Sequence, residues 1–210
     1  LLVLAGELMT AALDAEQRAS LNALVWASIH DGLSRSAWSK ELRADAPRLD
    51  LDASATFLGE PGATFVTLHR NAQLRGCIGT TRAYQPLGQD VVDHAFAAAF
   101  RDPRFDGLRP EELADLEIEI SVLGAPRPIP APDEQTLIEQ LRVGVDGLIL
   151  TAGHRSATFL PSVWEGLPDR RAFVSRLLIK AGFVAGTWPE GLRAQVYTVQ
   201  KWPAPSPANA

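Results

Sequence analysis

Two short apolar segments separated by a polar turn constrain the fold of this chain more than any other feature. Residues 63–68 are rich in β-branched and aromatic side chains, which favour a β-strand. Residues 71–73 are polar and fit the tip of a hairpin. Residues 74–80, with the sequence LRGCIGT, then form the returning strand. The sequence therefore predicts an antiparallel hairpin whose second strand carries the only cysteine of the 210 residues.

Cys77 and its neighbours form the candidate site. Because side chains alternate along a strand, Arg75 and Cys77 are expected on one face, and Leu74 and Gly76 on the other. A neighbouring guanidinium favours the thiolate form of a cysteine. Glycine within a strand marks a bulge or a close backbone approach, so Gly76 and Gly79 are expected to thin the wall of a pocket beside the sulfur. The alternative is a cysteine that packs as a small buried hydrophobe.

The register of this hairpin decides which residue lies opposite Cys77. With a three-residue loop, Thr67 lies opposite Cys77. In the same register, His69 lies opposite Arg75 and joins the polar site. With a two-residue loop, Val66 lies opposite Cys77 instead. Because a slip of one residue exchanges a polar neighbour for an apolar one, the sequence leaves both registers open.

A second strand, predicted over residues 116–123, supplies acidic side chains. Its alternation places Glu119 on the polar face, which meets solvent or a cleft. A turn is expected at Asp102-Pro103, because the residue before a proline avoids the helical conformation. Arg104 follows this turn directly. We predict that Arg104 forms a charge-assisted contact with an acid of this strand, with Glu119 as the first choice.

The remaining pattern predicts an α+β protein, because hairpins and helices follow each other without regular βαβ alternation. We expect a single domain in two lobes, mainly antiparallel sheet with flanking helices, in which the Pro-rich segment 125–132 links the lobes. An extension over residues 1–12, a domain over 13–202 and a disordered tail over 203–210 are predicted. Helices are expected over 14–31, 86–101, 133–141 and 169–181, and further strands over 147–151, 156–160 and 192–200.

The composition narrows the functional classes. The formal net charge is -5 and no run of Lys or Arg is present, so the electrostatics of a nucleic-acid binder are missing. One cysteine rules out an internal disulfide and fits the cytoplasm. Residues 1–5 are apolar but too few to span a membrane. The 4 histidines lack the spacing of metal ligands, so we predict no metal site, and His94 is interpreted as a hydrogen-bonded structural residue.

Several motifs resemble those of the AMMECR1 domain family, and they occur along the chain in the same order as in the family. LRGCIGT is similar to the family signature, and the resemblance covers about residues 13–202. It implies a single compact α+β domain. For bacterial and archaeal members it also implies one component of a three-part system with a Memo-like protein and a radical SAM protein. The other similar segments are AAFRDPRF (98–105), IEISVL (118–123), GVDGL (144–148), FLPSVW (159–164) and KAGF (180–183).

Two hypotheses of different classes follow. In the first, the chain is a cysteine-dependent enzyme component that acts on a small anionic substrate, with no cofactor that the sequence identifies. In the second, it is a non-catalytic binding or adaptor domain in which LRGCIGT is a structural or recognition element. For the enzyme, the candidate catalytic residues are Cys77, Arg75 and Glu119, and the candidate substrate-binding residues are Arg104, Gly76, Gly79 and His69.

Overall fold

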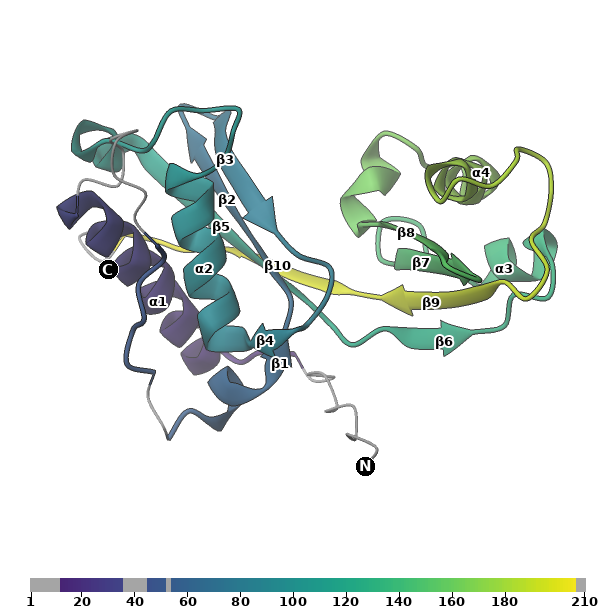
Figure 1. Ribbon diagram of the computed structural model, residues 1–210, viewed down its shortest axis with the longest axis horizontal. Helices are drawn as coiled ribbons and strands as arrows, with labels where there is room; N and C mark the ends of the chain where they lie inside the picture. The colour runs from purple at the N-terminus through teal and green to yellow at the C-terminus, as the bar shows by residue number, and fades with distance from the viewer. Residues whose placement is uncertain (1–11, 36–44, 52–53, 207–210) are drawn as a thin grey trace. The chain divides into compact units, whose positions relative to one another are not determined.

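The chain divides into two compact units, each with its own sheet and core. The computed structural model describes residues 12–35, 45–51 and 54–206 (Figure 1). Unit 1 comprises Leu1–Leu123 together with Gln200–Ala210, and unit 2 comprises Gly124–Val199. This division confirms the two predicted lobes. The antiparallel strand pairs and flanking helices confirm the predicted α+β class.

Unit 1 is built on a four-stranded sheet in the order β10-β5-β2-β3. A short strand pair and four helical segments complete the unit. Helix α2 packs on β2 and β3, and α1 packs against α2 (Figure 1). The elements are α1 (Ala15–Ser34), η1 (Thr56–Gly59), β1 (Pro61–Gly62), β2 (Thr64–Arg70), β3 (Gln73–Gly79), β4 (Gln85–Pro86), α2 (Leu87–Phe100), η2 (Pro110–Asp115), β5 (Leu116–Leu123) and β10 (Val199–Pro203).

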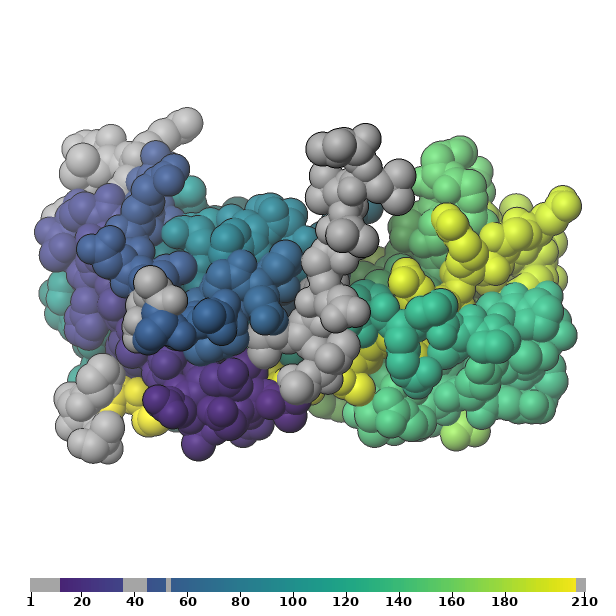
Figure 2. Space-filling model, turned by 90° about the horizontal axis from the view of Figure 1, so that it is seen from below, coloured from purple at the N-terminus to yellow at the C-terminus, as the bar shows by residue number. Residues whose placement is uncertain are grey.

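The alternation of the strands explains how this sheet buries one face. Val66 and Leu68 of β2 are fully buried, and they pair with Ile120 and Ile118 of β5. These side chains join the apolar face of α2 in one core. On the outside of this core, α1 keeps one face in solvent, and Figure 2 shows it in purple at the surface of unit 1. The sequence of each element thus matches its one-sided burial.

Unit 2 is a second four-stranded sheet, in the order β6-β9-β7-β8, with all printed pairs antiparallel. Its core is centred on Phe173, which is fully buried and stacks on the Trp164 ring with 3.6 Å between the centroids. Asp169 caps the N-terminus of α4 through a hydrogen bond with the Ala172 amide. The elements are β6 (Arg127–Ile129), α3 (Glu134–Gln140), β7 (Gly147–Ala152), β8 (Arg155–Phe159), η3 (Pro161–Glu165), α4 (Arg170–Lys180) and β9 (Arg193–Tyr197).

Two predicted segments differ from the structure. The Pro-rich segment 125–132 is more than a linker, because Arg127–Ile129 forms edge strand β6, where proline is tolerated. The predicted tail is wrong for its first residues. Pro203 ends β10, and Ala204 is buried, donates to the Ile118 carbonyl and accepts from the Trp26 indole. The predicted extension lies mostly outside the described residues, as do residues 207–210.

Candidate functional site

The turn of the β2–β3 hairpin has two residues. Asn71 and Ala72 both have positive φ, at 51° and 59°. This is the backbone of a tight hairpin turn of the type that matches the twist of the flanking strands. Arg70 consequently pairs with Gln73. Of the two loop lengths considered from the sequence, the structure adopts the shorter one.

A bulge at Arg75 then changes the register. His69 pairs with Leu74, but Leu68 pairs with Gly76, so that Arg75 is an extra residue on β3. Beyond the bulge Thr67 lies opposite Cys77, as the longer loop would have placed it. The hairpin therefore combines the short turn with the polar register.

The bulge also redistributes side chains between the two faces of the sheet. Leu74 lies opposite His69, which shares its face with Thr67 and therefore with Cys77. The expectation that Leu74 and Gly76 share a face is wrong, because the extra residue between them reverses the alternation. Accordingly, Leu74 is 41% exposed whereas Gly76 is buried.

The two glycines of the motif allow close packing of their neighbours. A Cβ atom added to Gly76 would lie 2.1 Å from the carbonyl oxygen of Ala98 on α2. At Gly79 it would lie 2.3 Å from the ring of Phe65. Both distances are far below van der Waals contact, so each glycine is required by a neighbour, and the predicted role in a pocket wall stays a prediction.

Cys77 is half-buried, and its sulfur belongs to a polar row that crosses the sheet. It accepts a hydrogen bond from the Thr67 hydroxyl at 3.4 Å. Thr67 in turn lies opposite Glu119 on β5, and the Glu119 carboxylate forms an ion pair of 2.9 Å with Lys201 of β10. Cys77 is thus not enclosed by apolar side chains alone. His69 lies one pair further along the same face and forms no hydrogen bond with Cys77 in the described part of the chain.

Asp102 and Arg104, here called the edge clamp, hold the backbone of Cys77. Asp102 accepts a hydrogen bond of 2.9 Å from the Cys77 amide, and Arg104 donates one of 3.2 Å to the Cys77 carbonyl. Arg104 also binds both carboxylate oxygens of Asp102, at 2.6 Å and 2.9 Å. The predicted contact between Arg104 and Glu119 is wrong, because Asp102 is nearer in sequence and takes the guanidinium.

Burial and charge make the clamp rigid at its acidic end. The Asp102 side chain is only 2% exposed. Hydrogen bonds from the Arg104 guanidinium hold the pKa of the Asp102 carboxyl far below its usual range, against the opposing effect of burial. The Cys77 amide adds to this lowering. Asp102 is therefore ionised at neutral pH.

Arg75 forms an ion pair with a different acid, Glu112. Its guanidinium binds Glu112 of η2 in a bidentate manner, at 2.7 Å and 3.0 Å, and lies 5.8 Å from the centroid of Phe105. Hydrogen bonding with Arg75 lowers the pKa of Glu112. The Arg75 side chain is 14% exposed. Arg75 therefore anchors the bulge to η2, and its charge is neutralised there.

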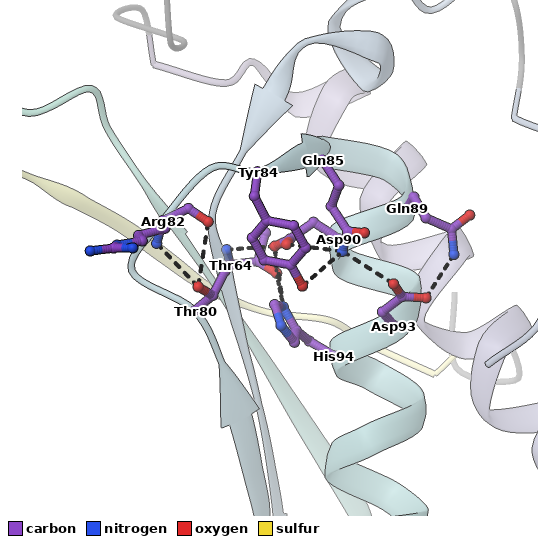
Figure 3. A network of polar contacts seen from close by, with 9 residues as sticks. All are labelled: Thr64, Thr80, Arg82, Tyr84, Gln85, Gln89, Asp90, Asp93 and His94. Atoms are coloured by element: carbon purple, nitrogen blue, oxygen red, sulfur yellow. Dashed lines mark hydrogen bonds and ion pairs between the residues drawn. The ribbon is translucent and has the colours of Figure 1, made fainter. Parts of the chain in front are cut away.

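A buried polar network at the start of β2 was not anticipated from the sequence (Figure 3). Asp90 of α2 is fully buried and accepts hydrogen bonds from the Thr64 amide and hydroxyl, at 2.8 Å and 2.7 Å. Gln85 donates to the other Asp90 oxygen and to Asp93. His94 completes the network, with its Nδ1 3.0 Å from the Thr64 hydroxyl. The interpretation of His94 as a hydrogen-bonded structural histidine is confirmed.

His94 contacts both other members at the centre of this network. Thr64 donates its hydroxyl proton to Asp90 at 2.7 Å. The Nδ1 atom of His94 lies 3.0 Å from the Thr64 hydroxyl oxygen and 3.2 Å from a carboxylate oxygen of Asp90. The only sequence signal for this arrangement was the i, i+4 spacing of Asp90 and His94 next to the apolar stripe of α2.

The described residues offer no group of three or more His, Cys, Asp or Glu side chains placed to hold a metal ion. Within the same residues, no helix combines the length and the apolar character that crossing a membrane requires. The site contains half-buried Cys77, Arg104 paired with buried Asp102, Arg75 paired with partly buried Glu112, and a buried polar network.

Two sheets with flanking helices, and a hairpin that carries a glycine-bracketed cysteine, define the class of this protein. The sequence profile of the AMMECR1 family matches residues 31–202, beginning later than the expected residue 13. The chain belongs to the AMMECR1 family. The crystal structure of the uncharacterized protein PH0010 from Pyrococcus horikoshii superposes with a TM-score of 0.67 at 29% identity, over 87% of this chain and 89% of that one.

Archaeal relatives support the same assignment. The protein LS215_2104 of Saccharolobus islandicus is 38% identical over 163 residues, which are 74% of this chain and 71% of the relative. A protein of Methanothermobacter thermautotrophicus is 38% identical over 71% of this chain and 79% of its own length. The protein Mbar_A1807 of Methanosarcina barkeri is 35% identical over 77% of this chain and 80% of its own length. None of these names states an activity.

Proposed function

We propose that this AMMECR1-family protein is a non-catalytic binding domain, in which the LRGCIGT segment is a structural element. The observation that carries the proposal is that the two candidate cations, Arg75 and Arg104, are each already paired with an acid of the same fold. Arg75 is neutralised by Glu112, and Arg104 is neutralised by Asp102. An anionic substrate would have to compete with carboxylates that already have bidentate geometry.

The surroundings of the thiol favour the same function. A cysteine nucleophile is activated by a base within hydrogen-bonding reach. The sulfur of Cys77 instead has Thr67 as its partner, and a threonine hydroxyl is not a base at neutral pH. Glu119, the third candidate catalytic residue, is held by Lys201. The groups of the motif are therefore arranged to hold β3 in place.

In this proposal, partner proteins perform the chemistry. The family resemblance suggests a Memo-like protein and a radical SAM protein as those partners, and a cytoplasmic location fits a chain with one cysteine. The test is to mix the purified protein with each partner from the same genome and to measure complex formation by size-exclusion chromatography with light scattering. We expect a complex that Cys77→Ser leaves intact. Failure to bind either protein would refute the proposed partners.

A second candidate function rests on the thiol of half-buried Cys77 itself. The Thr67 hydroxyl can stabilise a thiolate by hydrogen bonding, so a cysteine-dependent enzyme component is the alternative. Reconstitution of the three proteins distinguishes the two candidates. If Cys77→Ser preserves the complex but abolishes product formation, the cysteine is catalytic. If both properties survive, the protein acts by binding.

A further inference from the structure

The C-terminal end of α4 in unit 2 carries cations and exposed aliphatic side chains together. We call Arg155, Arg176, Ile179, Lys180 and Val184 the α4 patch. Ile179 is 48% exposed and Val184 is 71% exposed, and both are among the large hydrophobic residues that the fold leaves in solvent. Exposed aliphatic side chains rimmed by charged residues are typical of interaction surfaces.

The end of the helix is folded so that these residues meet. Gly182 has a φ of 84°, in the left-handed region that favours glycine. Its amide donates to the carbonyl of Ile179, and the amide of Phe183 donates to that of Leu178, at 2.9 Å and 3.0 Å. This pair of hydrogen bonds turns the chain back at the helix end, so Val184 follows directly beside the last turn of α4.

Two of the cations are fixed without being neutralised. Arg155 lies with its guanidinium 5.4 Å from the centroid of Phe183. Lys180 donates a hydrogen bond of 2.9 Å to the carbonyl of Thr158. Aromatic rings and carbonyl groups orient a cation but carry no net negative charge. Both side chains therefore keep their charge at the surface while losing little conformational freedom on binding a partner.

No carboxylate within the described ranges forms an ion pair with Arg155, Arg176 or Lys180. The sequence of α4, RRAFVSRLLIK, contains no acid at all. At the other end of the helix, by contrast, Arg171 pairs with Glu134. Arg171 in the first turn thus has an acidic partner, whereas Arg176 and Lys180 near the last turn have none in the described part of the chain, which directs a complementary partner to the α4 patch.

We propose that the α4 patch docks an acidic amphipathic segment of a partner protein. Carboxylates of the segment pair with the three cations, and its apolar side chains cover Ile179 and Val184. This inference rests on the proposed function, because it names the surface and the partner chemistry of a binding domain. A lipid surface is the less favoured occupant, since two aliphatic side chains bury little area in a membrane interface.

The test uses a synthetic peptide labelled with fluorescein. Its Leu and Glu residues are spaced so that, in a helix, Leu occupies one face and Glu the other. Its binding to the full chain is followed by fluorescence anisotropy. We expect saturable binding that weakens as salt rises from about 50 to about 500 mM, because exposed charges are screened. Arg176→Glu and Ile179→Gln should each weaken binding about tenfold, which corresponds to about 1.4 kcal/mol. Both side chains are exposed and form no hydrogen bond or ion pair with any residue that the structure describes, so the fold should survive.

Arg170→Glu is the matched control, since it makes the same charge change in the first turn of the same helix. It should leave peptide affinity unchanged. Absence of peptide binding, or equal loss in Arg170→Glu and Arg176→Glu, would overturn the inference. If the protein sediments with phosphatidylglycerol vesicles but does not bind the peptide, the patch binds a lipid surface and the inference of a protein partner is wrong. Because the peptide assay contains neither expected partner protein, its result is independent of the test of the proposed function.

Discussion

Replacement of Gly76 by alanine tests the packing of β3 against α2. The added Cβ atom would lie 2.1 Å from the Ala98 carbonyl oxygen and 3.1 Å from its carbon. A carbon–oxygen contact needs more than 3 Å, so strand and helix must separate by roughly 1 Å. The obstacle is backbone, which cannot rotate away as a side chain can. We therefore expect Gly76→Ala to lower the free energy of unfolding by about 1–3 kcal/mol, the usual cost of overpacking a core.

The assay is urea unfolding followed by intrinsic tryptophan fluorescence, to which Trp26 and Trp202 of unit 1 contribute, with Gly59→Ala as control. A Cβ atom on Gly59 meets no atom within 4 Å. That variant should be neutral or more stable by about 0.4–1 kcal/mol, because alanine reduces the freedom of the unfolded chain. If Gly76→Ala unfolds at the same urea concentration as the control, the close approach of β3 and α2 is not what requires glycine.

Three further predictions concern the polar groups. Asp102→Asn should remove a contribution to stability that is present above the unfolded-state pKa of about 3.9 and is lost as pH falls, because the folded-state pKa is depressed; the variant should show a shallower acid limb in pH-dependent thermal unfolding. Thr67→Val should slow alkylation of Cys77 in the folded protein, measured by mass spectrometry, since it removes the hydroxyl donor to the sulfur; an equal or faster rate contradicts this. Thr64→Val leaves the buried Asp90 without its hydroxyl donor and should cost about 1–3 kcal/mol in chemical unfolding, whereas a neutral effect would mean that the network is not a stabilising element.

The sequence predicted the strands better than their register. The strand predicted over residues 63–68 corresponds to β2 (Thr64–Arg70), and the alternation of residues 116–122 matches β5. The bulge at Arg75 could not be anticipated, because it satisfies two distant demands at once. Gly76 must meet the backbone of α2, and Arg75 must reach Glu112. Both partners are placed by tertiary packing, and the alternation of residues within one strand carries no information about tertiary contacts.

The candidate site shows the same limit. Cys77 and its polar neighbour Thr67 were among the alternatives, since hairpin pairing is local. The partners of the two arginines were missed. The sequence identifies Asp102 only as the residue before a proline that ends a helix, although its spacing from Arg104 allows a direct ion pair. Nothing in the sequence neighbourhood of Glu112 distinguishes it from a solvated acid.

The edge clamp has a consequence for how this protein stays apart from copies of itself. β3 is an edge strand, and an edge strand exposes amide and carbonyl groups that can recruit a strand of another molecule. At Cys77 these groups are taken by Asp102 and Arg104, so the clamp occupies the place of a neighbouring strand. Loss of the clamp should therefore appear first as self-association and low soluble yield, before any change in the secondary structure of the monomer.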